Sequence, residues 1–137
     1  MTIVNFKKQL DKLGLNSSNS IIMGSGILQA KGVRNSNDID LIVPKDIFIS
    51  LKNTPELVFE SRDDGDRLTN SSVEIFTQWN VLGEEKYHAD LLKDTVVIDN
   101  LRYLSLDLTT ALKKANGRPK DLLDLELINT FINKHYY

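Results

Sequence analysis

The sequence of 137 residues contains no cysteine, which excludes disulfide bonds and thiolate metal sites. No run reaches the roughly 18 apolar residues that a membrane-spanning helix needs. Residues 1–13 carry charges throughout, unlike a signal peptide. The net charge is only −2, so no global positive field attracts nucleic acid and any anion site must be local. We therefore expect a cytoplasmic protein without a membrane partner, and these features disfavour nucleic acid as a partner without excluding it.

The amino-acid composition is that of a globular domain, with 41% hydrophobic and 26% charged residues. A length of 137 residues suffices for one domain with a substantial core, so we expect a single domain over residues 1–137. Short apolar runs bounded by turns alternate with segments of helical periodicity. We therefore predict an α/β or α+β fold in which helices flank a mixed sheet and the chain ends in helices.

The periodicity also gives approximate boundaries for the elements. Helices are predicted at residues 3–13, 26–31, 47–52, 107–115 and 119–133. Strands are predicted at residues 20–23, 38–43, 57–60, 67–70, 73–77, 95–98 and 102–104. Residues 84–92 fit either a helix or an irregular crossing. Asp107 is the predicted N-cap of its helix, and the last helix is predicted to bury an apolar face made of Leu122, Leu125, Ile128 and Ile132.

A Gly-Ser turn follows the apolar strand that ends at Met23. Gly24 and Gly26 allow the backbone to approach a ligand closely, and Ser25 adds a hydroxyl group. If a helix starts at Ser25, its free N–H groups also face the ligand. Such a turn suits a nucleotide phosphate, although a Gly-Ser-Gly sequence alone is more often a flexible turn.

Two carboxylates follow on the next predicted strand. Residues i and i+2 of a strand point to the same face, so Asp38 and Asp40 project together while Ile39 and Leu41 point into the core. Paired carboxylates repel each other unless a cation lies between them. Mg²⁺ prefers one or two protein carboxylates together with substrate phosphates. The pattern therefore indicates a metal site, against the alternative of a solvated strand end.

Together, these motifs resemble the nucleotidyltransferase superfamily, which includes the catalytic core of DNA polymerase beta and kanamycin nucleotidyltransferase. Its signature is an apolar strand, Gly-Ser, a gap, and Asp-hydrophobic-Asp-hydrophobic, here Gly24-Ser25, twelve residues, and Asp38-Ile39-Asp40-Leu41. Residues 32–41, with Arg34 and Ser36 ahead of the acidic pair, are similar to small bacterial members. Residues 117–124, Gly-Arg-Pro-Lys-Asp-Leu-Leu-Asp, are similar to their usual ending. The resemblance covers most of the chain from residue 21 to residue 128.

The resemblance implies transfer of a nucleoside monophosphate from a nucleoside triphosphate, with ATP as the expected donor, to an acceptor hydroxyl, with release of pyrophosphate. Mg²⁺ or Mn²⁺ would be held by Asp38, Asp40 and a third carboxylate on a later strand. Glu74 is the best candidate for that third residue, since a charge in a β-rich run is otherwise out of place. It would assist metal binding or act as a base. Asp90 is the alternative, and Glu74 would then be an outward-facing residue.

Basic residues complete the expected site. The resemblance suggests that Lys113 or Lys114 faces the triphosphate. The alternative is that both lysines are solvated near the C-terminal end of a helix, where cations are favoured. Arg34 is expected to reach a phosphate or to pair with Asp38. Arg118 is expected to form a structural pair with Asp121 or Asp124. Trp79 and Phe76 are interpreted as core or partly buried aromatic residues rather than base-stacking platforms.

Two other functional readings stay open at this point. One is a non-catalytic nucleotide-binding or antitoxin-like interaction module on the same fold. Little chain is left for a dedicated acceptor domain, so a partner protein or a homodimer would complete the acceptor site. The other is an RNA-directed transferase, which the net charge of −2 disfavours.

Overall fold

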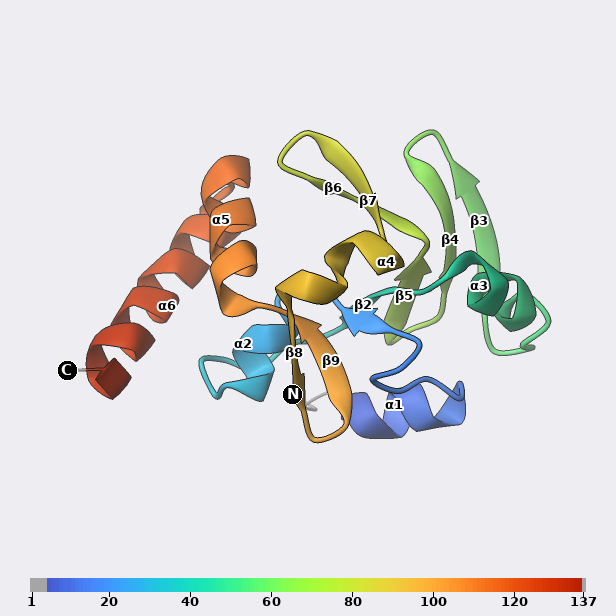
Figure 1. The fold of residues 1–137 in the computed structure, drawn as a ribbon, viewed down its shortest axis with the longest axis horizontal. Coiled ribbons are helices and arrows are strands. Elements are labelled where there is room, and N and C mark those ends of the chain that lie inside the picture. Colours follow the sequence, from blue (N-terminus) through green and yellow to red (C-terminus); the bar gives the residue numbers. More distant parts are fainter. Residues whose placement is uncertain (1–4, 137) are drawn as a thin grey trace.

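A mixed sheet of seven strands forms the centre of the protein in the computed structural model, which describes residues 5–136 (Figure 1). The strand order is β3-β4-β5-β2-β1-β9-β8. The strands are β1 (Ile21–Ile22), β2 (Ile39–Ile42), β3 (Val58–Arg62), β4 (Gly65–Thr69), β5 (Val73–Phe76), β8 (Thr95–Ile98) and β9 (Leu101–Leu104). Only the pairs β2–β5 and β1–β9 are parallel, and the other neighbours are antiparallel.

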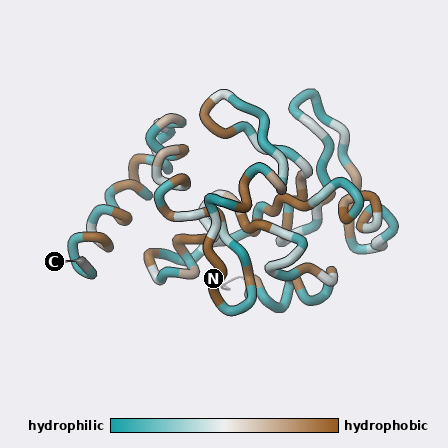
Figure 2. Tube along the Cα trace, in the orientation of Figure 1, coloured by the Kyte–Doolittle hydropathy of each residue, from teal (hydrophilic) through white to brown (hydrophobic). Residues whose placement is uncertain are grey.

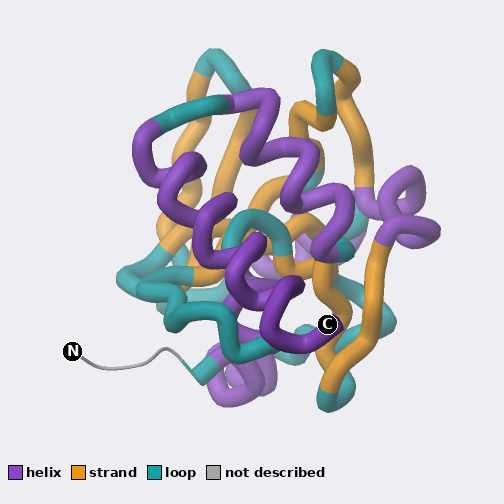
Figure 3. Tube along the Cα trace, turned by 90° about the vertical axis from the view of Figure 1, so that its left-hand side faces the viewer, coloured by secondary structure: helices purple, strands orange, loops and turns teal. Residues whose placement is uncertain are grey.

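The remaining elements surround this sheet. β6 (Gln78–Val81) and β7 (Glu84–Tyr87) form a separate hairpin. The helices are α1 (Phe6–Lys12), α2 (Gly26–Ala30), α3 (Lys45–Leu51), α4 (His88–Leu91), the 3-10 turn η1 (Leu92–Asp94), α5 (Leu106–Asn116) and α6 (Pro119–Tyr136). α5 and α6 lie side by side at one end of the molecule (Figures 1 and 3). The result is the predicted combination of a mixed sheet with flanking and C-terminal helices.

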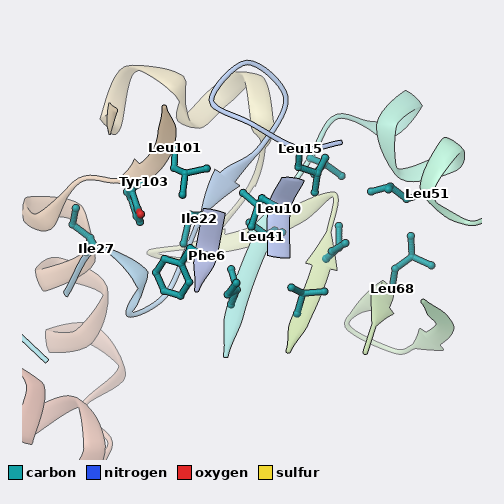
Figure 4. Packing of buried hydrophobic residues seen from close by; sticks show 14 of the residues in the cluster. Phe6, Leu10, Leu15, Ile22, Ile27, Leu41, Leu51, Leu68, Leu101 and Tyr103 are labelled. Atoms are coloured by element: carbon teal, nitrogen blue, oxygen red, sulfur yellow. The ribbon is translucent and has the colours of Figure 1, made fainter. Parts of the chain in front are cut away.

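The main core lies on one face of the sheet. Alternate strand residues point to this face, including Ile22, Leu41 and Ile75. α1 and α3 cover them through residues such as Phe6 and Phe48, and Figure 4 shows part of this packing. Because Ile39 and Leu41 belong to this cluster, the side chain of Asp40 lies on the opposite face, as the alternation predicts.

A smaller core occupies part of that opposite face. It contains Ile21, Met23 and Ile42 from the strands, together with Leu104. Val81 and Leu91 cover them from the hairpin and α4, and Trp79, Leu108 and Leu112 pack at its border. This cluster fixes the hairpin and α5 over the sheet beside Asp40, which creates the walls of the site described below.

Most predicted elements are confirmed, and three are corrected. Residues 78–87 form a hairpin that the sequence analysis missed, so only the end of the predicted 84–92 segment is helical. Ser105 rather than Asp107 caps α5, because the Ser105 hydroxyl accepts from the Leu108 amide at 3.2 Å. The first helix starts at residue 6, and Ile3 lies outside the described residues.

The predicted apolar face of the last helix is also wrong in part. Leu122 is 54% exposed and Ile132 is 36% exposed, whereas Ile128 is buried as predicted. Two carboxylates, Asp121 and Asp124, occupy the buried side instead, at 0% and 4% exposure. Hydrophobic and hydrophilic residues therefore alternate along α6 (Figure 2). None of the helices within residues 5–136 has the length and apolar character needed to cross a membrane.

Gly26 provides a direct test of how α2 packs on the sheet. A Cβ atom at this position would overlap the Cγ2 atom of the buried Ile22. We expect Gly26→Ala to lower the free energy of unfolding by about 1–3 kcal/mol, because a well-packed core tolerates an added methyl group poorly. Urea denaturation measures this loss. Ile22→Ala removes the opposing atom, so the double variant should lose less stability than the sum of the losses in the two single variants. Strictly additive losses would contradict the packing.

Candidate functional site

A cleft of about 400 Å³ lies between the end of β1, the start of β2 and the two C-terminal helices. Six of the seven residues predicted to form the site line it: Gly24, Ser25, Arg34, Asp38, Asp40 and Lys113. The seventh, Glu74, lies on the adjacent strand β5. The fold therefore brings together residues that are up to 89 positions apart in the chain (113 − 24).

The Gly-Ser turn packs directly against the second carboxylate. Gly24 has a φ of +58°, a conformation that side chains disfavour. A Cβ atom there would lie 3.0 Å from Oδ2 of Asp40. The Met23 amide donates to the Asp40 carbonyl oxygen at 2.7 Å, which fixes the turn beside the carboxylate. α2 has only five residues, so the Ser25 hydroxyl and nearby cations, rather than a helix dipole, are the groups available to an anion.

The acidic residues meet across two parallel strands. Asp40 on β2 pairs in register with Glu74 on β5, so both side chains leave the same face of the sheet. Asp38 precedes β2 and is exposed at the mouth of the cleft. Burial is the main cause that raises the pKa of Asp40 to about 6, and the negative charges of Asp38 and Glu74 raise it further. Lys120 and Arg67 oppose this shift without cancelling it.

Glu74 has a partner of its own. Nη1 of Arg67, on β4, donates to its carboxylate at 3.0 Å, and the guanidinium group lies over the Phe76 ring at 5.3 Å. The alternative third carboxylate, Asp90, caps α4 by accepting from the Tyr87 amide at 3.0 Å. Asp90 therefore has a local structural role, and Glu74 is the carboxylate that the sheet places beside Asp40.

The acidic residues fit a metal ion only in combination with a ligand. Among residues 5–136, no group of three or more His, Cys, Asp or Glu side chains is arranged to hold a metal ion. Asp38 and Asp40 nevertheless provide the one or two carboxylates that Mg²⁺ takes when phosphate oxygens supply its other ligands. The donor set therefore suits a cation that enters with a nucleotide.

A buried ionic network forms the opposite wall of the cleft. Asp124 on α6 accepts from Nε and Nη2 of Arg34 at 2.6 and 2.9 Å and from Nζ of Lys113 at 2.9 Å. The same two cations donate to the Ser25 hydroxyl oxygen, at 2.9 Å from Arg34 and 3.1 Å from Lys113. Arg34 thus pairs with Asp124 rather than with Asp38. Of Lys113 and Lys114, only Lys113 lines the cleft, since Lys114 is exposed outside it.

The network is ionic in spite of its burial. Burial alone raises the pKa of Asp124, but hydrogen bonds from Arg34 and Lys113 outweigh it and lower the pKa to about 2. A second pair closes the end of the cleft, where Nε of Arg118 donates to Asp121 at 2.7 Å. The expected structural pair of Arg118 is therefore with Asp121.

Several cleft residues were not among the predicted site residues. Asp124 and Asp121 were treated as partners of Arg118, although their spacing with Ile128 places all three on one helix face. Trp79 is half-buried at the border of the smaller core, as expected of a core or partly buried residue, and it also lines the cleft. Comparison of the chain with protein-family models, curated proteins and solved structures finds no match. The function of this cleft is therefore inferred from its own geometry.

The raised pKa of Asp40 predicts a pH-dependent stability. The folded state holds the carboxyl proton of Asp40 up to about pH 6, whereas the unfolded state releases it near pH 3.8. The free energy of unfolding of the wild type should therefore decrease as the pH rises from 3.8 to about 6. Above pH 6 the ionised folded carboxylate is disfavoured by about 1–2 kcal/mol, after allowance for its partial exposure. Asp40→Asn should remove this penalty, so we expect it to stabilise the protein at pH 7.5 and to do so less at pH 4.5.

Urea denaturation at both pH values measures the effect. Asp11→Asn, which removes a charge from the exposed side of α1, is the matched control and should show no such pH-dependent gain. Equal effects of Asp40→Asn at the two pH values would contradict the assigned environment of Asp40.

Asp124 is predicted to be the most sensitive residue of the network. Asp124→Asn removes the anion that the buried Lys113 contacts at 2.9 Å and leaves Asp121, at 3.8 Å, as its remaining anionic partner, so we expect a loss of about 3 kcal/mol in the free energy of unfolding at pH 7. Glu126→Gln changes an exposed carboxylate on the same helix and should alter stability by no more than about 0.5 kcal/mol. Chemical denaturation compares the two variants, and losses of equal size would contradict the buried network.

Proposed function

We propose that the protein is a metal-dependent nucleotidyltransferase that moves a nucleoside monophosphate from a nucleoside triphosphate to an acceptor hydroxyl. The observation that carries the proposal is the close packing of Gly24 against the Asp40 carboxylate, beside Glu74 on the neighbouring parallel strand. This arrangement puts a turn suited to phosphate within reach of carboxylates suited to a divalent cation. The mixed sheet and C-terminal helices support a nucleotidyltransferase fold.

The phosphates of the nucleotide would lie along the basic wall of the cleft. Ser25, Arg34 and Lys113 present a hydroxyl group and two cations, and Lys120 lies on the side nearer Asp40. Arg34 and Lys113 already donate to Asp124 and to the Ser25 hydroxyl, so a phosphate would share these donors or replace some of these hydrogen bonds.

Asp38 and Asp40 would hold Mg²⁺ or Mn²⁺ together with phosphate oxygens. The bound cation would supply charge neutralisation for the phosphates and for the departing pyrophosphate. Without it, burial disfavours the ionised form of Asp40, and the charges of Asp38 and Glu74 disfavour it further, which together raise its pKa. The chain therefore contributes a group of carboxylates that repel one another, and a cation that binds together with the nucleotide would relieve this repulsion.

In the proposed reaction, the acceptor oxygen bonds to the α-phosphorus while the bond from this phosphorus to the bridging oxygen breaks. Pyrophosphate leaves with that bonding pair. The acceptor proton passes to Glu74, whose carboxylate lies beside Asp40 and is oriented by Arg67. Most of the rate enhancement would come from positioning and charge stabilisation.

ATP is the donor that we propose first, and a cytoplasmic location suits a reaction that consumes a nucleoside triphosphate. The acceptor would approach from the open side of the cleft. A partner protein or a second copy of the chain would complete the acceptor site.

One observation favours a second candidate, a non-catalytic nucleotide-binding or antitoxin-like module. Glu74 is engaged by Arg67, and the residues described here contain no preformed group of three carboxylates for metal. In such a module the cations would bind a nucleotide without transfer. The two candidates differ in whether binding depends on Asp38, Asp40 and a divalent cation.

Thermal unfolding with each of the four nucleoside triphosphates, with and without Mg²⁺, tests the proposal. A ligand at 100 times its dissociation constant stabilises by about 2.7 kcal/mol, which corresponds to several degrees for a domain of this size. We expect a Mg²⁺-dependent shift that Asp38→Asn and Asp40→Asn abolish, because these carboxylates hold the cation. Asp63→Asn, in the exposed turn between β3 and β4, is the matched control and should retain the full shift.

Transfer itself is measured with nucleotide labelled at the α-phosphate and three acceptor classes: an aminoglycoside, a polypeptide and an RNA 3′ end. Label that moves to one class in the wild type and not in Asp38→Asn would support the transferase. A nucleotide shift that persists without Mg²⁺ and in both aspartate variants would favour the non-catalytic module. No shift with any nucleotide would count against nucleotide binding by this chain alone and would favour the antitoxin-like interaction module or a site completed by a partner.

A further inference from the structure

A small recess of about 60 Å³ adjoins the cleft on the side of the β6–β7 hairpin. Gly24, Trp79 and Lys113 line both spaces. A ligand bound along the basic wall of the cleft can therefore extend into the recess. Leu104 on β9 and Leu112 on α5 provide further walls. This volume is enough for about four water molecules, so it admits the edge of a planar ring but not a whole nucleoside.

Trp79 is well placed to act as the flat wall of this space. Among the described residues that line the cleft, it is the only aromatic residue. Its indole is half-buried and is held edge-on against Phe76, with ring centroids 5.4 Å apart and an interplanar angle of 87°. It also packs at the border of the smaller core, so its orientation is fixed without a ligand. A fixed aromatic surface costs little ordering free energy when a ring stacks on it.

Polar groups lie at the edges of the recess. Asn116 and Arg118 line its exposed side, at the junction of α5 and α6. The Thr109 side chain contributes to the inner wall, and its buried hydroxyl oxygen has no hydrogen-bond partner. A nucleobase has apolar faces and a hydrogen-bonding edge, which matches an indole and a leucine side chain bordered by amide, guanidinium and hydroxyl groups.

From this juxtaposition, and resting on the proposed function, we propose that Trp79 and the recess beside it form the nucleobase subsite. The triphosphate lies against Ser25 and Lys113, the base stacks on Trp79, and the edge of the base enters the recess between Trp79 and Leu112. Stacking supplies affinity for any base, because every base has a π-face. The polar edge supplied by Thr109 and Asn116 discriminates among the four bases.

Trp79 is the only tryptophan in the chain, so its fluorescence reports directly on this subsite. The experiment titrates the full-length protein with Mg²⁺ and each of the four nucleoside triphosphates, and separately with inorganic tripolyphosphate. We expect the favoured nucleotide to quench Trp79 and to bind roughly 5- to 100-fold more tightly than tripolyphosphate. Tripolyphosphate should bind, compete with the nucleotide and leave the emission nearly unchanged.

The variants Trp79→Ala and Trp79→Phe, followed by calorimetry, separate stacking from folding. Trp79→Ala should reduce the affinity for the nucleotide to the affinity for tripolyphosphate. The affinity for tripolyphosphate itself should stay unchanged, which would show that the basic wall of the cleft is intact. Trp79→Phe keeps an aromatic face and should retain most of the nucleotide preference. Asn116→Ala, at an exposed helix end, should narrow the differences in affinity among the four nucleotides.

The outcomes separate this inference from the proposed function. Equal affinities for nucleotides and tripolyphosphate, with no change in Trp79 emission, would overturn the nucleobase subsite and leave the phosphate site in place. A nucleotide preference that survives Trp79→Ala would also overturn it. Absence of binding by both nucleotides and tripolyphosphate would overturn the proposed function itself.

Discussion

The basic wall of the cleft depends on one buried carboxylate, that of Asp124. It binds Arg34, from the loop before β2, and Lys113, from α5, and both cations meet at the Ser25 hydroxyl. A single anion therefore ties together three parts of the chain and the last helix. Removing a buried anion while its partners stay buried is costly. The basic wall of the cleft is thus kept in place by the same charges that make it attractive to phosphate.

Asp40 and Asp124 have the same side chain and opposite electrostatic environments. Burial disfavours ionisation of both, but two cations bind Asp124 directly and lower its pKa to about 2, whereas two other carboxylates beside Asp40 help raise its pKa to about 6. Asp124 therefore stabilises the fold as an ion, and Asp40 destabilises it when ionised. A carboxylate that costs stability and lines a cleft is typical of a binding or catalytic residue rather than of a structural one.

Local patterns were sufficient for the strands of the main sheet and for most of the residues that line the cleft, because a Gly-Ser turn and two carboxylates at a spacing of two can be recognised without knowledge of contacts. They were not sufficient for the network around Asp124. That residue is separated from Arg34 by 90 positions, and the prediction of an apolar face for the last helix favoured Leu122 and Ile132, which are exposed. The β6–β7 hairpin was missed because Gln78–Val81 and Glu84–Tyr87 are largely polar strands outside the main sheet, in which only Trp79 and Val81 contact the smaller core.

The opposite face of the sheet is divided between a core and a site, and this division explains how a chain of 137 residues accommodates both. Met23, Ile42 and Leu104 cover the part that anchors α5 and the hairpin. The adjoining part carries the charges of Asp40 and Glu74, and no helix within residues 5–136 covers it with apolar side chains of the smaller core. α5 therefore has two roles, since Leu108 and Leu112 hold it on the apolar part while Lys113 reaches toward Ser25. The cleft exists because the smaller core ends where the acidic residues begin.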